Sequence, residues 1–500
     1  MPSDLRSQVT SKIQAVQIRV EARLETWRRA RTPVSFREME LEVHRVAREF
    51  ADELSGTILT DMCRDPDCQL ETTVAALTAS GGRLRRSGRA TVKVTLLGGG
   101  KVPVKVAYLA PATRRRRKRG YNSRRGRRQG QGLYPLLVTL GIWYGVTPAL
   151  AGEIVRQVAD SDSVRTGREA LARRGIDLGH KQTLRIFNAF SGRAVAQRSE
   201  WLLEALQQPP RHGVLCGKRV VVATDGGRLR ERVPLKGRRN KKTGHHRFNA
   251  PWREPKLLVV YVVNDKGEVD RSFRPVLDGT LGDCDAIFAM LAGYLRALGA
   301  HEAKELILLG DGAKWIWDRA AQLATVVGVP LERLHELVDW YHADETLNKV
   351  IAERTGLSNE KREHWLKRAE TALYRGDITE LMQLFDEIAV GRKSRAINNH
   401  RDYFERNVDR MQYKDFTAAN RPIGSGAIES GVRRVINMRL KSNGSFWRYE
   451  NAEAMLLMRS YLKAGRFDDL VDWSISTATP WWSPSDQVRA PLREATGVAA

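Results

Sequence analysis

Two short apolar runs constrain the fold of this 500-residue chain more than any other feature, because each leads into an Asp-Gly pair. The first covers residues 219–224 and meets Asp225, and the second covers residues 305–309 and meets Asp311 after one glycine. A short apolar run bounded by turn residues is typical of a buried strand. Asp-Gly is also a common turn pair, so a turn after a strand explains each aspartate taken alone.

The segment between the two aspartates predicts the order of the remaining elements. We expect a second strand (257–263), a hairpin turn (264–267) and a third strand (268–276). A helix (283–298) and a fourth strand (305–309) should follow. Strands in hairpin succession, then a helix, then a strand ending in aspartate, follow the order of a ribonuclease-H-like core. The predicted fold class is therefore α/β, a mixed five-stranded sheet with flanking helices. Neighbouring strands in such a sheet would bring Asp225 and Asp311 together, which favours a shared site over two unrelated turns.

A third acidic residue, Glu429, lies about one turn into a helix that starts at a Gly-Ser-Gly sequence. Two magnesium ions about 3.5–4 Å apart, bound by converging carboxylates, can cleave a phosphodiester bond, and Mg²⁺ prefers hard oxygen ligands. Arg433 and Arg434 on the next turn, and Lys441 beyond them, would bind phosphate beside such ions. The simpler interpretation is a glutamate near a helix start that pairs with Arg433 at i+4.

The charge balance indicates a polyanionic partner. Lys and Arg outnumber Asp and Glu by 84 to 58, a formal net charge of +26, and neutralising phosphates releases counterions. Nucleic acid is favoured over ribosomal association or an anionic membrane. The densest segment, residues 114–128, holds ten cations, and a solvated loop is its alternative. The expected DNA contacts there are Arg114, Arg115, Arg116, Arg117, Lys118 and Arg119.

Residues 148–190 predict three short helices, with a Gly-Ile-Asp-Leu-Gly turn before the third. Two helices joined this way resemble a helix-turn-helix, whose second helix enters the major groove. Many other three-helix packings share the pattern. The residues that this helix would present to DNA are His180, Lys181, Gln182 and Arg185.

The rest of the N-terminal half predicts helices over residues 4–62 and a β-hairpin over 88–106 that turns at three glycines. The polar N-terminus predicts no signal peptide, and two prolines interrupt the uncharged stretch 129–152, so no membrane span is expected. Four cysteines fit a reducing cytosol, and Cys63 and Cys68 are expected to be ordinary thiols. The expected location is cytoplasmic.

Four motifs carry a resemblance to a known family. They are Ala-Thr-Asp-Gly-Gly (223–227), Leu-Leu-Gly-Asp-Gly-Ala-Lys-Trp-Ile-Trp (308–317), Asp-Trp-Tyr-His-Ala (339–343) and Pro-Ile-Gly-Ser-Gly-Ala-Ile-Glu-Ser (422–430). Over residues 215–475 the chain resembles bacterial insertion-sequence transposases of the ISKra type, which are related to Mutator-like transposases. Many members carry paired cysteines around an N-terminal hairpin, where this chain has arginines.

The resemblance implies a DDE triad of Asp225, Asp311 and Glu429 that binds two Mg²⁺ ions, for which Mn²⁺ can substitute. It also implies an all-helical insertion between the second and third acids, and an Asp-x-x-His motif at Asp339 and His342. A supporting role for His342 is expected, as an orienting group for water or phosphate. The alternative is a buried histidine hydrogen-bonded to Asp339.

Seven regions are expected along the chain. The first three are an N-terminal helical region (1–86), a hairpin with the arginine-rich segment (87–132) and a helix-turn-helix-like domain (133–215). They are followed by a first core part (216–330), a helical insertion (331–423), a core part with the Glu helix (424–475) and a tail (476–500). The expected function is a DNA transposase, a homodimer or larger, that cleaves the terminal inverted repeats of a mobile element and joins 3′-hydroxyl ends to target double-stranded DNA. The alternatives are an inactive DNA-binding regulator and a related nuclease without strand transfer.

Overall fold

The computed structural model describes residues 3–112, 132–391 and 394–476, apart from positions 236, 238, 241–243, 245 and 443. The arginine-rich segment 114–128 and the tail after residue 476 lie outside the described residues. The chain divides into two compact units. Unit 1 contains the residues up to Phe190 together with those from Asp468, and unit 2 contains Ser191–Phe467.

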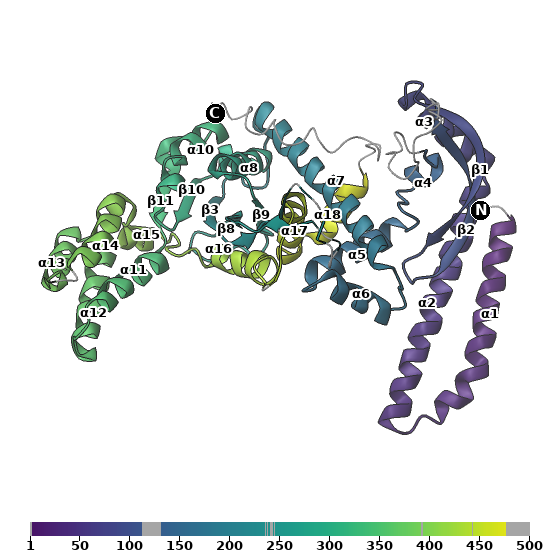
Figure 1. Cartoon of the computed structure of the whole chain (residues 1–500), viewed down its shortest axis with the longest axis horizontal. Helices are drawn as coiled ribbons and strands as arrows, with labels where there is room; N and C mark the ends of the chain where they lie inside the picture. Colours follow the sequence, from purple (N-terminus) through teal and green to yellow (C-terminus); the bar gives the residue numbers. More distant parts are fainter. Residues whose placement is uncertain are drawn as a thin grey trace. The chain divides into compact units, whose positions relative to one another are not determined.

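Unit 1 begins with helices and the predicted hairpin (Figure 1). The elements are α1 (Ser3–Arg28), α2 (Pro33–Arg64), α3 (Pro66–Ala79), β1 (Leu84–Thr95) and β2 (Lys101–Pro111). The two strands pair antiparallel, with Val94 opposite Val102, which confirms the hairpin. Pairing already begins at Leu84, so the predicted domain boundary after residue 86 is wrong: a bulge between Arg86 and Arg89 lets β1 extend further back than the apolar alternation indicated.

The buried side of the hairpin packs on α2 and α4. Val94, Val104 and Val106 form a core cluster with Leu59 and Cys63. Burial, reinforced by the neighbouring Cys68, raises the pKa of the Cys63 thiol to about 11. Cys63 is therefore a protonated core residue at neutral pH, as expected of an ordinary thiol.

The remaining helices of unit 1 confirm the predicted breaks at the prolines. They are α4 (Pro135–Thr139), α5 (Pro148–Asp160), α6 (Val164–Arg173) and the first part of α7 (His180–Gln207). No helix in the described part of the chain is both long and apolar enough to cross a membrane.

Two further elements differ from the predicted domain division. The third predicted helix continues to Gln207, and the division between units falls inside it, whereas a boundary was predicted at residue 215. Helix α18 (Phe467–Ser476) belongs to unit 1 from Asp468 onward, whereas these residues were predicted to belong to the core part with the Glu helix. The reason is packing: Asp468 pairs with Arg156, and Val471 lies against Gly152 of α5.

Unit 2 is built on a five-stranded mixed sheet in the order β11-β10-β3-β8-β9, which confirms the predicted sheet class. Strand β10 runs parallel to β3 and β11, and β8 runs antiparallel to β3 and β9. The bounds are β3 (Arg219–Gly226), β8 (Lys256–Val263), β9 (Val276–Thr280), β10 (Glu305–Gly310) and β11 (Leu334–Val338).

The predicted third strand over residues 268–276 is wrong, because β9 starts only at Val276. After the turn at Asn264, a single bridge joins Val263 to Val269. The Asp270 side chain then accepts from the backbone and hydroxyl of Ser272, which turns the chain away from the ladder.

Helices cover both faces of this sheet, so β8 is buried at every position. One face packs against α8 (Cys284–Ala297), α9 (Lys314–Trp317) and α10 (Ala320–Val327), which share a core with the strands. Helices α16 (Gly426–Gly431) and α17 (Tyr449–Lys463) contact β3, β8 and β9. Between them lies the π-helix η5 (Val432–Asn437), and the short 3₁₀ turns are η1 (Ala300–Glu302), η2 (Leu331–Arg333) and η4 (Val408–Arg410).

A helical segment follows β11 (Figure 1). The description of residues 331–423 as all-helical is wrong at Leu334–Val338, which add an edge strand to the sheet because their carbonyls and amides pair with β10. In the described residues beyond that strand the elements are helical: α11 (Trp340–Glu353), α12 (Asn359–Arg375), α13 (Ile378–Ile388), α14 (Ser394–Asn407), η4 and α15 (Tyr413–Ala418). Of the four leucines whose helical spacing predicts a packed face, Leu373, Leu381 and Leu384 are fully or almost fully buried and Leu366 is half-buried.

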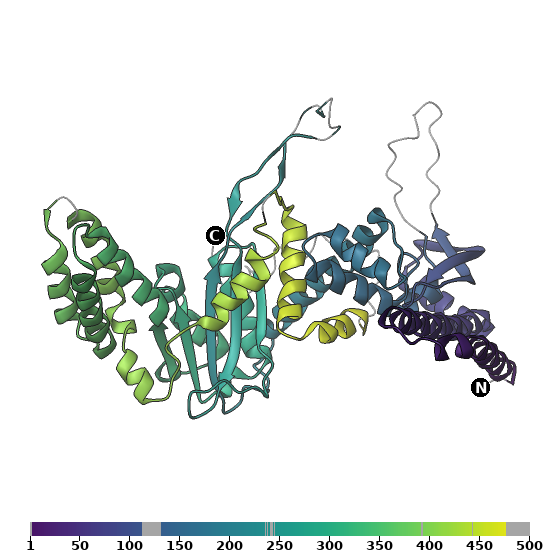
Figure 2. The same cartoon turned by 90° about the horizontal axis from the view of Figure 1, so that it is seen from below.

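A narrow ribbon leaves the sheet between β3 and β8 and extends beyond it (Figure 2). It consists of β4 (Leu229–Arg230) paired with β7 (Trp252–Arg253), and β5 (Val233–Pro234) paired with β6 (Phe248–Asn249). The segment before α17 joins this ribbon, because Trp447 accepts from the Arg232 amide at 2.7 Å and donates to Arg230 at 2.9 Å.

A buried ionic network ties the helices of unit 2 to its edge strand. Arg198 of α7 lies 3.0 Å from Asp278 of β9 and 3.2 Å from Glu453 of α17. The Tyr294 hydroxyl of α8 donates to Asp278 at 2.7 Å. Burial acts to lower the pKa of Arg198, but the two carboxylates more than offset it, so its pKa stays above the ordinary value and the guanidinium remains charged.

We expect Arg198→Met to lower the free energy of unfolding of unit 2 by about 3–5 kcal/mol, because it leaves two carboxylates without their buried counter-ion. Urea denaturation followed by circular dichroism measures the change. Lys349→Met is the matched control: its ion pair with Glu345 is more than half exposed, so the loss should stay within about 1 kcal/mol. Equal effects of the two variants would contradict the role given to the network.

Candidate functional site

Adjacent parallel strands carry the two aspartates to the same edge of the sheet. The last paired residues of β3 and β10 are Ala223 and Leu309, and each aspartate stands two residues further along its own chain. Asp225 accepts from the Gly226 amide at 2.6 Å, and Asp311 accepts from the Ala313 amide at 2.9 Å. Rigid strand ends therefore direct both carboxylates, as the sequence predicted.

Helix α16 brings Glu429 to that edge from far along the chain. It lies across β3 and β8, where a Cβ on Gly431 would be only 2.9 Å from Leu257. Leu257 is the residue that pairs with Asp225 in the sheet. The helix then widens into η5, where the Met438 amide donates to the Arg433 carbonyl five residues back. Such π-turns inside helices often accompany functional sites.

The electrostatics of Asp225 show that the three carboxylates share one environment. Burial is the largest influence and raises the pKa of Asp225, and the charges of Asp311 and Glu429 raise it further. The Gly226 amide and His342 oppose that shift. A partly buried carboxylate beside two others is costly without a cation, because burial and like charge both disfavour ionisation.

The His342 side chain is directed to Glu429 and only its backbone amide meets Asp339, which differs from the alternative of a buried histidine bonded to Asp339. The imidazole Nε2 of His342 lies 3.8 Å from Glu429 Oε1, and the side chain is 30% exposed. Asp339 is fully buried and caps α11, accepting from the Tyr341 amide at 2.6 Å and the His342 amide at 3.3 Å. Its other oxygen accepts from the Ser425 amide at the start of α16. Asp339 thus joins the segment that carries His342 to the segment that carries Glu429.

Helix α14 supplies positioning residues that the sequence did not reveal. The Tyr403 hydroxyl donates to the Asp311 carbonyl at 3.1 Å, and Asn407 donates to Gly312 at 3.4 Å. Gly312 has φ +88°, and a Cβ there would be 2.6 Å from the Tyr403 ring. The glycine after Asp311 is therefore required by protein packing as well as by the turn. A lone tyrosine on a predicted helix gave no signal of this contact.

A basic cleft of about 460 Å³ opens next to Asp225. It is lined by the glycines after Asp225, by the ribbon and by η5, and its cations are Arg228, Arg253 and Lys441. Lys441 was expected to bind DNA, whereas Arg253 was not singled out. Arg433 and Arg434, also expected to bind DNA, are exposed.

Other candidate contacts are distributed differently. Arg439 is 6% exposed and lies 5.0 Å from the Trp447 ring centroid, so it packs beneath that tryptophan and is not available to bind DNA. In unit 1, the start of α7 exposes His180, Lys181 and Arg185, while Gln182 is half-buried. The six cations at 114–119 lie outside the described residues.

Asp225, Asp311 and Glu429 offer hard oxygen donors from three segments, the ligand type that divalent cations such as Mg²⁺ prefer. Like-charge repulsion at Asp225 favours a cation there. The three do not form a group with all ligand atoms within 4.8 Å; among the described residues, only His212, Cys216 and Glu302 do so.

No protein-family model matches the chain, and no curated protein matches it.

Asp225→Asn should raise the free energy of unfolding by about 1 kcal/mol near neutral pH in the absence of divalent cations, because it removes a partly buried charge that lies beside Asp311 and Glu429. Because folding raises the pKa of Asp225, its stabilising contribution is present below the pKa of the unfolded chain and is lost as pH rises through the folded pKa. The gain of the variant should therefore grow with pH. Thermal melts over a pH series test this. Asp318→Asn, which removes an exposed pair with Lys314, serves as the control. An Asp225→Asn variant that is less stable than wild type at every pH would refute the raised pKa assigned to Asp225.

Proposed function

We propose that the chain is a DNA transposase of the DDE type, with a ribonuclease-H-like core that cleaves element ends and joins them to target DNA. The observation that carries the proposal is the convergence of Asp225, Asp311 and Glu429 on one sheet edge, where Asp225 responds to both other charges. These residues come from a central strand, its parallel neighbour and a helix more than a hundred positions further on. Three of the four motifs that resemble ISKra-type transposases lie at these elements, and the fourth, residues 339–343, opens α11.

The arrangement of unit 2 supports the ribonuclease-H-like interpretation. Its sheet has three antiparallel strands in chain order, followed by two strands parallel to the first, with helices on both faces. Helices α11–α15 enter between β11 and α16, as a helical insertion between the second and third acids requires. Tyr403 and Asn407 of this insertion hydrogen-bond the Asp311 loop, so the insertion helps to position Asp311.

The chain's own residues would divide the work at the site. Asp225, Asp311 and Glu429 would hold two Mg²⁺ ions, which polarise the scissile phosphate and lower the pKa of the attacking hydroxyl. Asp339 orients Glu429 and His342 together through its capping contacts. His342 lies beside Glu429 and its side chain is partly exposed, so its imidazole can hydrogen-bond a phosphate oxygen or the incoming water.

The basic cleft and ribbon would hold the DNA backbone next to these carboxylates. Arg230 stacks on Trp252 at 4.8 Å, and Arg232 stacks on Phe248 at 4.5 Å, which stiffens the ribbon. Phosphate contacts of this kind position the duplex without reading its sequence. The start of α7 and the segment 114–119 are proposed as further DNA contacts, and assembly as a dimer or larger would pair two element ends.

Asp225→Asn, Asp311→Asn and Glu429→Gln should each reduce cleavage in Mg²⁺ by at least about 10²-fold, the scale of losing one transition-state contact. The substrate is a plasmid that carries the DNA flanking the gene, with nicking and strand transfer followed on gels. Binding to the same DNA, measured by anisotropy, should remain, because the cleft is intact.

Asp318→Asn and Glu345→Gln are matched controls, because both residues are surface acids near the site that pair with lysines. They should retain wild-type cleavage. If any of the three site variants cleaves like wild type, that residue leaves the triad. Binding without cleavage by wild type would favour the regulator, and cleavage without joining would favour the nuclease.

The double variant Arg228→Gln, Lys441→Gln should weaken binding to all duplexes alike. Each lost phosphate contact flattens the slope of log K against log salt by about 0.9, so the change should reach roughly 2. Lys304→Gln is the control, since this lysine pairs with Asp265 at the opposite edge of the sheet. By contrast, alanine at His180, Lys181 and Arg185 should erode the preference for end sequences. A cleft variant with an unchanged salt slope would remove the cleft from the DNA path.

A further inference from the structure

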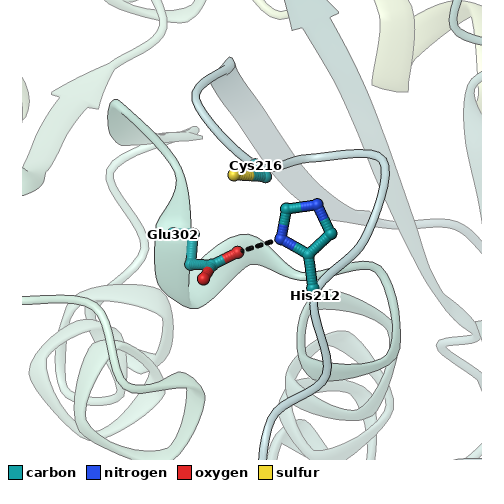
Figure 3. Close-up of side chains that lie close together, drawn as sticks. All are labelled: His212, Cys216 and Glu302. Carbon is teal, nitrogen blue, oxygen red and sulfur yellow. Dashed lines mark hydrogen bonds and ion pairs between the residues drawn. The ribbon is translucent and has the colours of Figure 1, made fainter.

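A second group of ligand-type side chains lies at the other end of the central strands. His212 and Cys216 stand in the turn before β3, and Glu302 ends η1 just before β10. Their ligand atoms all lie within 4.8 Å of one another, and Figure 3 shows the three side chains converging. The aspartates stand at the opposite ends of the same strands, and eight residues of β3 span about 25 Å. The group therefore cannot serve the same ions.

Backbone hydrogen bonds join the two turns that carry the group, so the positions of the three ligand side chains are fixed before any ion binds. The Gly217 amide donates to the Glu302 carbonyl at 2.9 Å, and the Leu215 amide donates to Leu298 at 3.0 Å. Gly213 and Gly299 touch backbone to backbone: a Cβ on Gly299, which has φ +82°, would be 2.4 Å from the Gly213 nitrogen. Side chains at either position would push the two turns apart.

Glu302 is the centre of the group. Its Oε2 lies 2.6 Å from His212 Nδ1, and the Cys216 sulfur lies within 4.8 Å of the carboxylate. His212 is 77% exposed and Glu302 41% exposed, so solvent ions reach them directly. A cation placed among these three side chains would replace the proton that His212 and Glu302 share.

We infer that His212, Cys216 and Glu302 form a zinc site on the amino-terminal side of the central strands, separate from the proposed catalytic centre and independent of the proposed function. Thiolate, imidazole and carboxylate together are a ligand set for Zn²⁺, and water completes the tetrahedron. Bonds of about 2.0–2.1 Å place neighbouring N and O ligands about 3.3 Å apart. The imidazole therefore moves outward by less than 1 Å, which its exposure permits. On binding, the thiol proton passes to solvent, and the neutral imidazole exchanges its Nδ1 proton through solvent for one on Nε2, so that Nδ1 can coordinate and one proton is released in all.

His301 is adjacent but is assigned no bond to the ion. Its Nε2 lies 3.9 Å from Glu302 Oε1, outside the group of three. It lies next to Glu302 without belonging to the group, so replacing it should weaken Zn²⁺ binding less than replacing one of the three ligands. The site would clamp the turn before β3 to the turn before β10, and thereby the two strands that lead to Asp225 and Asp311.

The test uses the full-length protein, stripped with chelator and titrated with Zn²⁺ by calorimetry and with Co²⁺ by absorption spectroscopy. Wild type should bind Zn²⁺ at this site with a rise in melting temperature. Co²⁺ should give the near-ultraviolet thiolate charge-transfer band and the visible bands of tetrahedral coordination. Cys216→Ser should abolish the thiolate band, and Cys216→Ser and His212→Ala should weaken Zn²⁺ binding by about 100-fold or more, beyond the effect of losing an outer partner.

Cys284→Ser is the matched control, since Cys284 is another half-buried free thiol of unit 2. It should bind both metals like wild type, and His301→Ala should bind Zn²⁺ more tightly than His212→Ala. Circular dichroism of each variant without metal shows whether it is folded. A thiolate band that survives Cys216→Ser, or wild type without Zn²⁺ binding or a Zn²⁺-dependent melting shift, would overturn the inference. Neither result bears on DNA cleavage, which is measured separately with the carboxylate variants.

Discussion

The buried charge of Arg198 is the interaction on which the architecture of unit 2 depends. One guanidinium links α7, the edge strand β9 and helix α17 through Asp278 and Glu453, and Tyr294 adds α8. Such a pair is worth little against a hydrophobic replacement, but losing one partner is expensive. Helix α17 in turn holds η5, because Arg459 donates to the Val435 carbonyl at 3.0 Å. The position of Glu429 therefore depends on the ion pairs of Arg198, which hold α17 and, through α17, the helix that carries Glu429.

The carboxylate edge illustrates a conflict between stability and proposed function. The same strand ends that give Asp225 and Asp311 a fixed direction also concentrate negative charge where burial already disfavours it. A hydrophobic or amide side chain would suit the fold better there. That a partly buried acid occupies the position supports a cation-binding role, since perturbed carboxylates cluster at functional sites.

Backbone capping explains how distant segments reach one place. Asp339 satisfies the amides that open α11 and the amide of Ser425 that precedes α16. Because it is fully buried, these are strong and directional contacts. The helices between those two segments can therefore be long and still return the chain to the sheet. Tyr403 adds a contact from their midst to the Asp311 loop.

The sequence by itself determined strands at 219–224, 257–263 and 305–309, each within two residues of the observed bounds, together with the hairpin of unit 1 and the three acids as candidates, because apolar runs and alternation report burial directly. It misplaced β9, missed the edge strand β11 and misdrew the unit boundary inside α7, since these depend on partners far along the chain. Only the tertiary structure brought Asp225, Asp311, Glu429 and His342 into one electrostatic environment, revealed Tyr403 and Asn407 behind them, and assembled His212, Cys216 and Glu302. Local pattern carries the period of a strand, whereas distances between side chains arise from packing, which no single segment encodes.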